Sequence, residues 1–312
     1  MTLPNSLIEQ LREEAISQLR GIEAFESVWG KRSNFFRDKL PPAGHVTRQS
    51  ILDLGEHLSE AFQLEGKQDR SQGSLSSGGS VWEALVVWYL NLCMTGTRAV
   101  CFRGGKLCPQ PIKDALSILH ESTVLRSEPD VIIVSSEQLQ VHPRTAKKGL
   151  LAPTANLVAQ NHFASLGVVN LQCKTNWNDN AQIPMLWNML YNQARKGAVI
   201  SNGFTIGKSG YSLMNLGHFG YAFVTVPTQT KGPAGYKPTA LEVLRVKSMT
   251  AGNYWGHPSK QAVCSCISQL FGFFTRNKNI FPNVADIGKD AATAMNNPDT
   301  SPYDIKALLF PQ

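Results

Sequence analysis

The sequence lacks the motifs by which many enzymes are recognised. It contains no glycine-rich phosphate loop, no Gly-x-Ser-x-Gly nucleophile elbow and no His-Glu-x-x-His metal motif. Its 6 cysteines are scattered, and none forms a Cys-x-x-Cys pair matched by a second pair. This spacing argues against a zinc site and predicts reduced, buried thiols. These absences make an α/β enzyme of an unrelated class a weak hypothesis.

Long apolar runs are also absent. No stretch reaches the roughly 18–20 residues that cross a membrane. The first residues, 1–9, contain no basic region followed by an apolar run. We therefore expect no signal peptide, no membrane partner and a cytoplasmic location. The 312 residues suffice for one large or two ordinary domains.

Acidic residues are scarce in the second half of the chain. Residues 138–280 carry 14 Lys and Arg but only 2 acids, Asp179 and Glu242, a net charge of +12. Residues 1–137 carry 14 Lys and Arg and 17 acids, a net charge of −3. A block that basic predicts a polyanionic partner, and nucleic acid is the natural one. A basic surface kept for solubility is the alternative.

Hydrophobic periodicity predicts interleaved helices and strands. Helices are expected over 5–27, 47–64, 80–94, 111–120, 180–195 and 259–274, and strands over 99–102, 131–134, 168–174, 219–226 and 241–247. Irregular chain is expected over 30–44, a linker or mobile loop over 66–79 and a loosely packed tail after Pro282. The pattern indicates an α/β fold with a central mixed β-sheet flanked by helices. The predicted divisions are an N-terminal helical region (1–75), a core (76–285) and a C-terminal tail (286–312).

The most informative segment is the expected strand 168–174. Because strand residues alternate between faces, Val169, Leu171 and Cys173 should point to a core while Gln172 and Lys174 share the opposite face. Upstream, Asp130 follows Pro129 and precedes the apolar strand 131–134. A lysine and an aspartate on neighbouring strand ends form a layout suited to cutting phosphodiester bonds.

With these residues, the chain resembles the PD-(D/E)xK nucleases, and above all their type II restriction endonucleases. The resemblance covers roughly residues 80–195 and implies a restriction-endonuclease-like core, a Mg²⁺ cofactor and double-stranded DNA as substrate. In it, Asp130 matches the first aspartate, Lys174 matches the lysine and Glu83 matches a helix glutamate more loosely. Gln172 stands where the family has Asp or Glu. The metal ligands implied are therefore Asp130, Glu83 and either Gln172 or Asp179.

Each of these residues also has an ordinary structural explanation. Glu83, three residues after Ser80, fits a capping box at the start of the helix 80–94. Asp130 could be a turn residue, and Lys174 could be an exposed lysine. Asp179 with Gln182 fits a capping box for the following helix, which is the preferred reading of Asp179.

Basic and amide residues outside the motif are candidates for DNA contacts. They are Arg144, Lys147, Lys148, Arg195, Lys208, Lys231, Lys237, Arg245, Lys247 and Asn253. Several lie in loop-like sequence that could grip phosphates, although Arg195 also suits a helix C-terminus. Arg245 and Lys247, expected on one face of the strand 241–247, and Asn253 in the turn that follows are the candidates for reading base edges.

The resulting expectation is a Mg²⁺-dependent type II restriction endonuclease that cuts double-stranded DNA at a short sequence. Such enzymes commonly act as homodimers, because a twofold-symmetric protein matches a palindromic site. Two alternatives stay open. One is a sequence-specific DNA-binding protein without catalysis, in which Gln172 marks a decayed site, and the other is a repair or junction nuclease on the same core.

Overall fold

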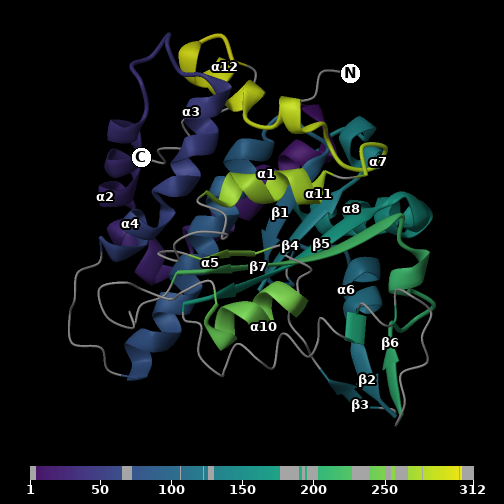
Figure 1. The fold of residues 1–312 in the computed structure, drawn as a ribbon. Coiled ribbons are helices and arrows are strands. Elements are labelled where there is room, and N and C mark those ends of the chain that lie inside the picture. Colours follow the sequence, from purple (N-terminus) through teal and green to yellow (C-terminus); the bar gives the residue numbers. More distant parts are fainter. Residues whose placement is uncertain are drawn as a thin grey trace.

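The protein has a mixed α/β fold, seen in a computed structural model (Figure 1). The structure describes residues 5–64, 72–105, 107–121, 123–125, 130–175, 190–191, 194, 203–226, 239–249, 254–256, 266–275, 277–301 and 303. The expected α/β fold with a central mixed sheet flanked by helices is confirmed.

The central sheet has 5 strands in the order β1-β4-β5-β7-β8. The strands are β1 (Ala99–Arg103), β4 (Val131–Ser135), β5 (Gly167–Lys174), β7 (His218–Thr225) and β8 (Tyr254–Gly256). β1, β4 and β5 pair antiparallel, whereas β5, β7 and β8 pair parallel. Four of the five strands expected from apolar runs therefore lie in this sheet.

One face of the sheet packs against α5 (Gln72–Met94) and the N-terminal helices. Val169, Leu171 and Cys173 of β5 belong to the same core cluster as Trp82 and Trp88 of α5. Val168 belongs to a second cluster, formed with α6 (Gln110–Leu116) and α8 (Leu151–Asn161) on the other face. A sheet covered on both faces explains why every residue of β5 except Lys174 is buried.

The N-terminal region is helical, as expected, but its divisions differ. It consists of α1 (Leu7–Leu19), α2 (Glu23–Lys39), α3 (Arg48–Asp53) and α4 (Leu58–Gln63). The single helix expected over 5–27 is therefore divided between α1 and α2. The prediction of irregular chain over 30–44 was largely wrong, because α2 extends to Lys39. α2 continues because Phe25, Trp29 and Phe36 are buried on one side of it, while Glu23 and Lys39 suit the two ends of the helix dipole.

α1 is fastened to the edge of the sheet by a buried ion pair. Arg12 Nε donates to Glu9 Oε2 at 2.9 Å, and Arg12 Nη2 also donates to the carbonyl of Thr97 at 3.2 Å. Glu9 Oε1 accepts from the backbone N–H of Gly96 at 2.9 Å. Both charges are buried but hydrogen-bonded, so α1 is held beside the turn that precedes β1.

Two segments expected to be loosely structured pack against the core. The linker predicted over 66–79 was wrong from Gln72 onward, because α5 begins there. The tail predicted after Pro282 contains α12 (Lys289–Asn296), whose Ala291, Ala292 and Ala294 are buried. Their burial beside α3 and α5 explains the order of this segment.

The strand expected over 241–247 is a helix, α10 (Leu241–Met249). Val243 and Val246 are buried, whereas Leu241 and Leu244 are exposed. Buried residues three apart follow the helical repeat, so the alternation of Leu241, Val243, Arg245 and Lys247 was misleading. The proposed shared strand face of Arg245 and Lys247 is therefore wrong.

Smaller elements complete the fold. The expected helix 111–120 ends as α6 at Leu116 and continues into β2 (Ile118–His120), which pairs with β3 (Thr123–Leu125) and β6 (Phe204–Ile206) in a second, antiparallel sheet. α7 (Glu137–Val141) follows β4, and α11 (Phe271–Phe274) lies within the expected helix 259–274. Most of the expected helix 180–195 lies outside the described residues.

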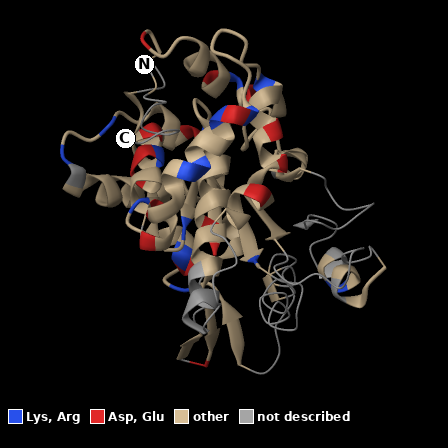
Figure 2. Ribbon diagram, turned by 90° about the vertical axis from the view of Figure 1, so that its left-hand side faces the viewer, with Lys and Arg blue, Asp and Glu red and all other residues tan. Residues whose placement is uncertain are grey.

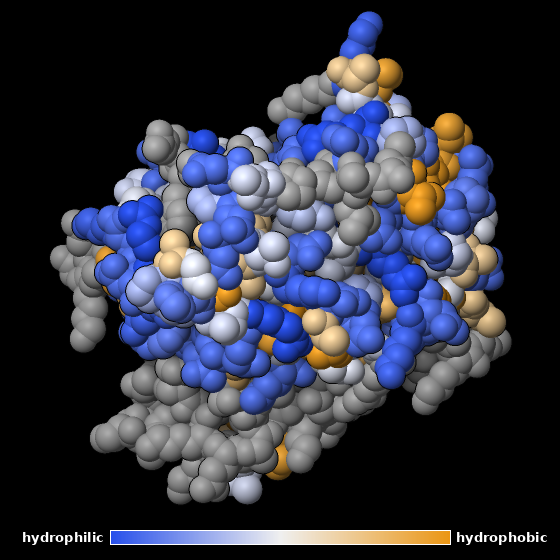
Figure 3. Space-filling model, turned by 90° about the horizontal axis from the view of Figure 1, so that it is seen from above, coloured by the Kyte–Doolittle hydropathy of each residue, from blue (hydrophilic) through white to orange (hydrophobic). Residues whose placement is uncertain are grey.

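The surface of the N-terminal helices carries both charge signs. Figure 2 shows Lys and Arg mixed with Asp and Glu on that side, as the near-neutral balance of residues 1–137 suggests. On the described part of the face in Figure 3, hydrophilic residues predominate and apolar residues form small separate groups. No helix among the described residues has the length and apolar character needed to cross a membrane.

Candidate active site

Asp130 lies one residue before β4, at the end of the strand that adjoins β5. β4 and β5 pair antiparallel with Val131 opposite Leu171, and continuing this register sets Asp130 opposite Gln172. Residues opposite each other in a ladder share a face, as do residues two apart in a strand. The backbone therefore puts Asp130, Gln172 and Lys174 on one face of the sheet.

One oxygen of the Asp130 carboxylate receives three hydrogen bonds. Oδ2 accepts from the amide of Gln172, from the backbone N–H of Cys173 at 2.9 Å and from Lys174 Nζ at 3.1 Å. The side chains of Asp130 and Lys174 are only 15% and 27% exposed, so their ion pair is largely shielded from water. The structure thus brings together three of the predicted site residues from two neighbouring strands.

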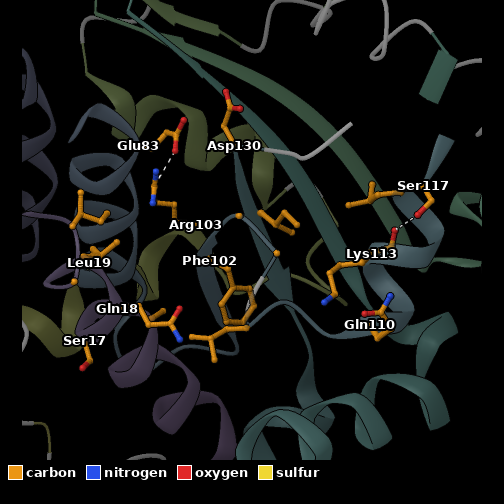
Figure 4. A pocket seen from close by; sticks show the side chains of 18 of the residues that line it. Ser17, Gln18, Leu19, Glu83, Phe102, Arg103, Gln110, Lys113, Ser117 and Asp130 are labelled. Atoms are coloured by element: carbon orange, nitrogen blue, oxygen red, sulfur yellow. Dashed lines mark hydrogen bonds and ion pairs between the residues drawn. The ribbon is translucent and has the colours of Figure 1, made fainter. Parts of the chain in front are cut away.

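Glu83 reaches the same region from α5. Its Oε2 accepts a hydrogen bond from Arg103 Nε at 2.9 Å (Figure 4). Arg103 Nη2 also donates to Ser80 Oγ at 2.9 Å. Because α5 begins at Gln72, Ser80 and Glu83 lie inside the helix and the capping-box interpretation was wrong. Arg103 ends β1 directly opposite Val131, beside Asp130.

Burial works against ionisation of both carboxylates. Burial, reinforced by the nearby charge of Asp130, raises the pKa of Glu83 to about 7, although Arg103 and Lys174 act in the opposite direction. Burial also raises the pKa of Asp130, against the opposing effect of Lys174 and the hydrogen bonds to Oδ2. Two ionised carboxylates held this way would be stabilised by an added positive charge.

This arrangement predicts a pH effect on stability that Glu83→Gln removes. The folded-state pKa of Glu83, about 7, lies above its unfolded value, so the folded state binds more protons between these values. The free energy of unfolding therefore falls as pH rises from about 4.5 to about 7. In EDTA, we expect Glu83→Gln to raise the melting temperature relative to wild type at pH 8 and to change it much less at pH 4.5. An equal difference at both pH values would contradict this electrostatic picture.

The donor set suits Mg²⁺ only if the substrate contributes. Among the described residues, no group of three or more His, Cys, Asp and Glu side chains could hold a metal ion. Mg²⁺ is commonly held by one or two carboxylates together with substrate phosphates and water. Asp130 and Glu83 supply two carboxylates with raised pKa values. Gln172 contacts Asp130 through its amide nitrogen, and its amide oxygen would bring no charge to an ion. Asp179, the other candidate ligand, lies outside the described residues.

A groove of about 1070 Å³ opens beside the carboxylates. Its walls come from the end of α1, from β1 and the turn after it, and from α6 (Figure 4). Val124 of β3 and Lys208 also line it. Glu83, Arg103 and Asp130 line one part of it, so the candidate site is accessible from this groove.

Two predicted DNA contacts already have acidic partners in the protein. Both terminal nitrogens of Arg144 donate to the Glu13 carboxylate of α1, one of them at 2.9 Å. Lys208 Nζ lies 3.5 Å from Asp114 Oδ1, on the rim of the groove. A DNA phosphate would have to compete with these carboxylates for the two side chains. The observed role of Arg144 is to hold α1 through Glu13.

The other predicted contacts are scattered or undescribed. Lys147 is exposed and Lys148 begins a short 3₁₀ turn. Arg245 is half-buried in α10, and Lys247 belongs to the same helix. Arg195, Lys231, Lys237 and Asn253 lie outside the described residues. The predicted DNA contacts that lie among the described residues therefore belong to several separate segments of the chain.

Sequence reasoning missed Arg103, which contacts Glu83 and Ser80 directly. The signal was present, because Arg103 ends the apolar strand 99–102 just as Lys174 ends β5. A charged residue at the last position of a buried strand lies where the strand leaves the core, and a binding site can form there. Lys113, on the wall of the groove, was also missed, and nothing in its local sequence distinguishes it.

No known family model matches the sequence, and a search of curated proteins finds no significant match.

Proposed function

We propose that the protein is a Mg²⁺-dependent endonuclease that hydrolyses phosphodiester bonds in double-stranded DNA, as a type II restriction enzyme does. The observation that carries this proposal is the position of Lys174 Nζ, 3.1 Å from the buried carboxylate of Asp130. A second carboxylate, Glu83, lies close enough to Asp130 that the charge of Asp130 helps to raise the pKa of Glu83. The net charge of +12 over residues 138–280 supports a polyanionic substrate.

In the proposed reaction, a water oxygen attacks phosphorus in line with the bond to the 3′ oxygen. That bond breaks, the 3′ oxygen takes up a proton, and the products carry a 5′-phosphate and a 3′-hydroxyl. Bound Mg²⁺ would supply charge neutralisation and a lower pKa for water. The carboxylates of Asp130 and Glu83 would hold the ion, and the ammonium group of Lys174 would orient the water and offset negative charge on the phosphate.

Digestion of a mapped phage DNA tests this function. A restriction enzyme produces discrete bands in Mg²⁺ and none in EDTA, and sequencing the ends gives the site. A smear, or cutting confined to branched substrates, would favour the repair or junction nuclease. Failure to cut any DNA under these conditions would contradict the proposal.

A DNA-binding protein without catalysis is the second candidate. It is favoured by one observation: each carboxylate already has a cation from the protein, Lys174 for Asp130 and Arg103 for Glu83. An uncharged Gln172 fits the same picture. This candidate predicts that wild type binds DNA in Mg²⁺ and leaves it intact.

Gln172→Glu tests the departure from the nuclease pattern. Gln172 is 6% exposed and contacts Asp130, so a glutamate there adds a third carboxylate to a buried site. In EDTA we expect a loss of roughly 1–3 kcal/mol in the free energy of unfolding. Mg²⁺ should restore the stability, and cleavage should reach its maximum rate at a lower Mg²⁺ concentration.

Gln138→Glu, on the half-buried surface of α7, is the matched control for the same change of charge. It should show no Mg²⁺-dependent recovery. If Gln172→Glu behaves like this control, position 172 does not face a metal, and Asp179 becomes the candidate for the second ligand.

A homodimer is part of the proposal, because paired active sites cut both strands of a palindromic sequence. The N-terminal helices could supply the contact. Sedimentation of the purified protein with and without a cognate duplex measures the oligomeric state directly. A single active protomer per duplex would contradict the proposed homodimer.

A further inference from the structure

The walls of the groove beside the candidate site carry both apolar and charged residues. Leu107 and Val124 supply apolar surface, and Val124 is 41% exposed although it lies in a strand. Gln110, Lys113 and Lys208 supply polar and positively charged groups. A ligand that complements both kinds of residue carries a flat apolar part and an anionic group, as a nucleotide does.

Lys113 is the cation best placed to receive the anionic group. It projects from α6 into the groove (Figure 4), and its aliphatic chain passes Gly105 in the turn after β1. Lys208 is paired with Asp114, but no described carboxylate forms an ion pair with Lys113. A half-buried ammonium group without a carboxylate partner is suited to a phosphate.

The groove also includes part of the proposed cleavage site, because Glu83 and Asp130 line it together with Lys113. At about 1070 Å³ it is near the upper size of a small-molecule pocket, roughly 300–1,000 Å³. A cavity of this volume can hold a single nucleotide.

We propose that this groove holds an unpaired nucleotide of the DNA substrate next to the scissile phosphate, with a phosphate on Lys113 and a base against Leu107 and Val124. This inference rests on the proposed nuclease function and adds a substrate feature, since the enzyme would engage one unstacked strand beside the cut. Extrusion of a base from a duplex costs a few kcal/mol, which contacts in the groove would offset.

The test is binding of a short fluorescein-labelled oligothymidylate, measured by fluorescence anisotropy in EDTA so that nothing is cut. Unlabelled single strand of equal length should compete with the labelled oligonucleotide. Lys113→Ala should weaken binding about tenfold and lower the slope of log K against log salt by about 0.7, the value for one phosphate contact to a single strand. Val124→Glu, at an exposed position that tolerates the change, should weaken binding at least as much, because it puts a carboxylate in the groove.

Lys289→Ala is the matched control. It removes the same charge from an exposed position at the start of α12, which Figure 1 places on the opposite side of the sheet from α6. Equal weakening by Lys113→Ala and Lys289→Ala, with melting temperatures unchanged, would overturn the proposal by reducing the effect to net charge. Oligothymidylate binding that neither Lys113→Ala nor Val124→Glu weakens would also overturn it.

The two proposals fail separately. If wild type cuts DNA but Lys113→Ala binds like Lys289→Ala, the groove inference is wrong and the nuclease stands. If oligothymidylate binding depends on Lys113 but Mg²⁺ never produces cutting, the proposed function is wrong and the nucleotide site stands.

Discussion

Lys174→Met should abolish DNA cleavage while leaving DNA binding nearly intact. The substitution keeps the length and apolar stem of the side chain but removes the ammonium group that lies 3.1 Å from Asp130 Oδ2. Loss of a charged group that orients water and stabilises transition-state charge costs roughly 10²–10⁴-fold in rate. The measurement is the single-turnover rate of plasmid cleavage in Mg²⁺, with affinity for the same DNA measured in Ca²⁺.

Lys289→Met provides the control for this variant, because it removes one positive charge at a distance from the site. Both variants should bind DNA slightly more weakly, as expected for one lost charge. Only Lys174→Met should lose cleavage. Retention of full activity by Lys174→Met would show that the pair of Lys174 and Asp130 has no part in the reaction, and the candidate site would have to be abandoned.

Asp130→Asn should have the second large effect. The substitution preserves the shape of the side chain, and its amide oxygen can still accept the hydrogen bond from the Cys173 backbone. It removes the negative charge that Lys174 contacts and that a divalent ion would need. Metal-assisted charge stabilisation contributes several kcal/mol, so we expect the cleavage rate to fall roughly 10³-fold.

Calorimetry separates loss of metal from loss of fold in this variant. Wild type should bind Mn²⁺ in the presence of a DNA duplex, and Asp130→Asn should bind it at least about tenfold more weakly, as expected when a metal site is impaired. Its melting temperature in EDTA should stay close to that of wild type, because burial already raises the pKa of Asp130. Unchanged Mn²⁺ affinity would place the metal elsewhere.

The strands that build the site were predictable because their residues are buried on both faces. β1, β4, β5 and β7 are short apolar runs bounded by polar residues, and such runs in an α/β chain suit a covered sheet. Residues at the ends of neighbouring strands must meet at a sheet edge. That is why the meeting of Asp130 with Lys174 followed from two segments far apart in the sequence.

Other parts of the fold and of the site depend on tertiary packing, which cannot be predicted from the local sequence pattern. Residues 241–247 alternate like a strand, but tertiary packing buries Val243 and Val246 and makes a helix. Glycine and serine before Ser80 indicated a linker, yet α5 extends back to Gln72, which changes Glu83 from a helix cap to a groove-lining residue. The contact of Arg103 with Glu83 joins β1 to α5 and required knowing how the helix lies on the sheet.

Conversion of supercoiled plasmid by the wild-type protein, with Mg²⁺ and with EDTA, tests the central claim most directly. We expect linear or open-circular DNA in Mg²⁺, intact DNA in EDTA, and intact DNA with Lys174→Met in either buffer. Wild-type protein that binds the plasmid but leaves it supercoiled in Mg²⁺ and in Mn²⁺ would contradict the claim.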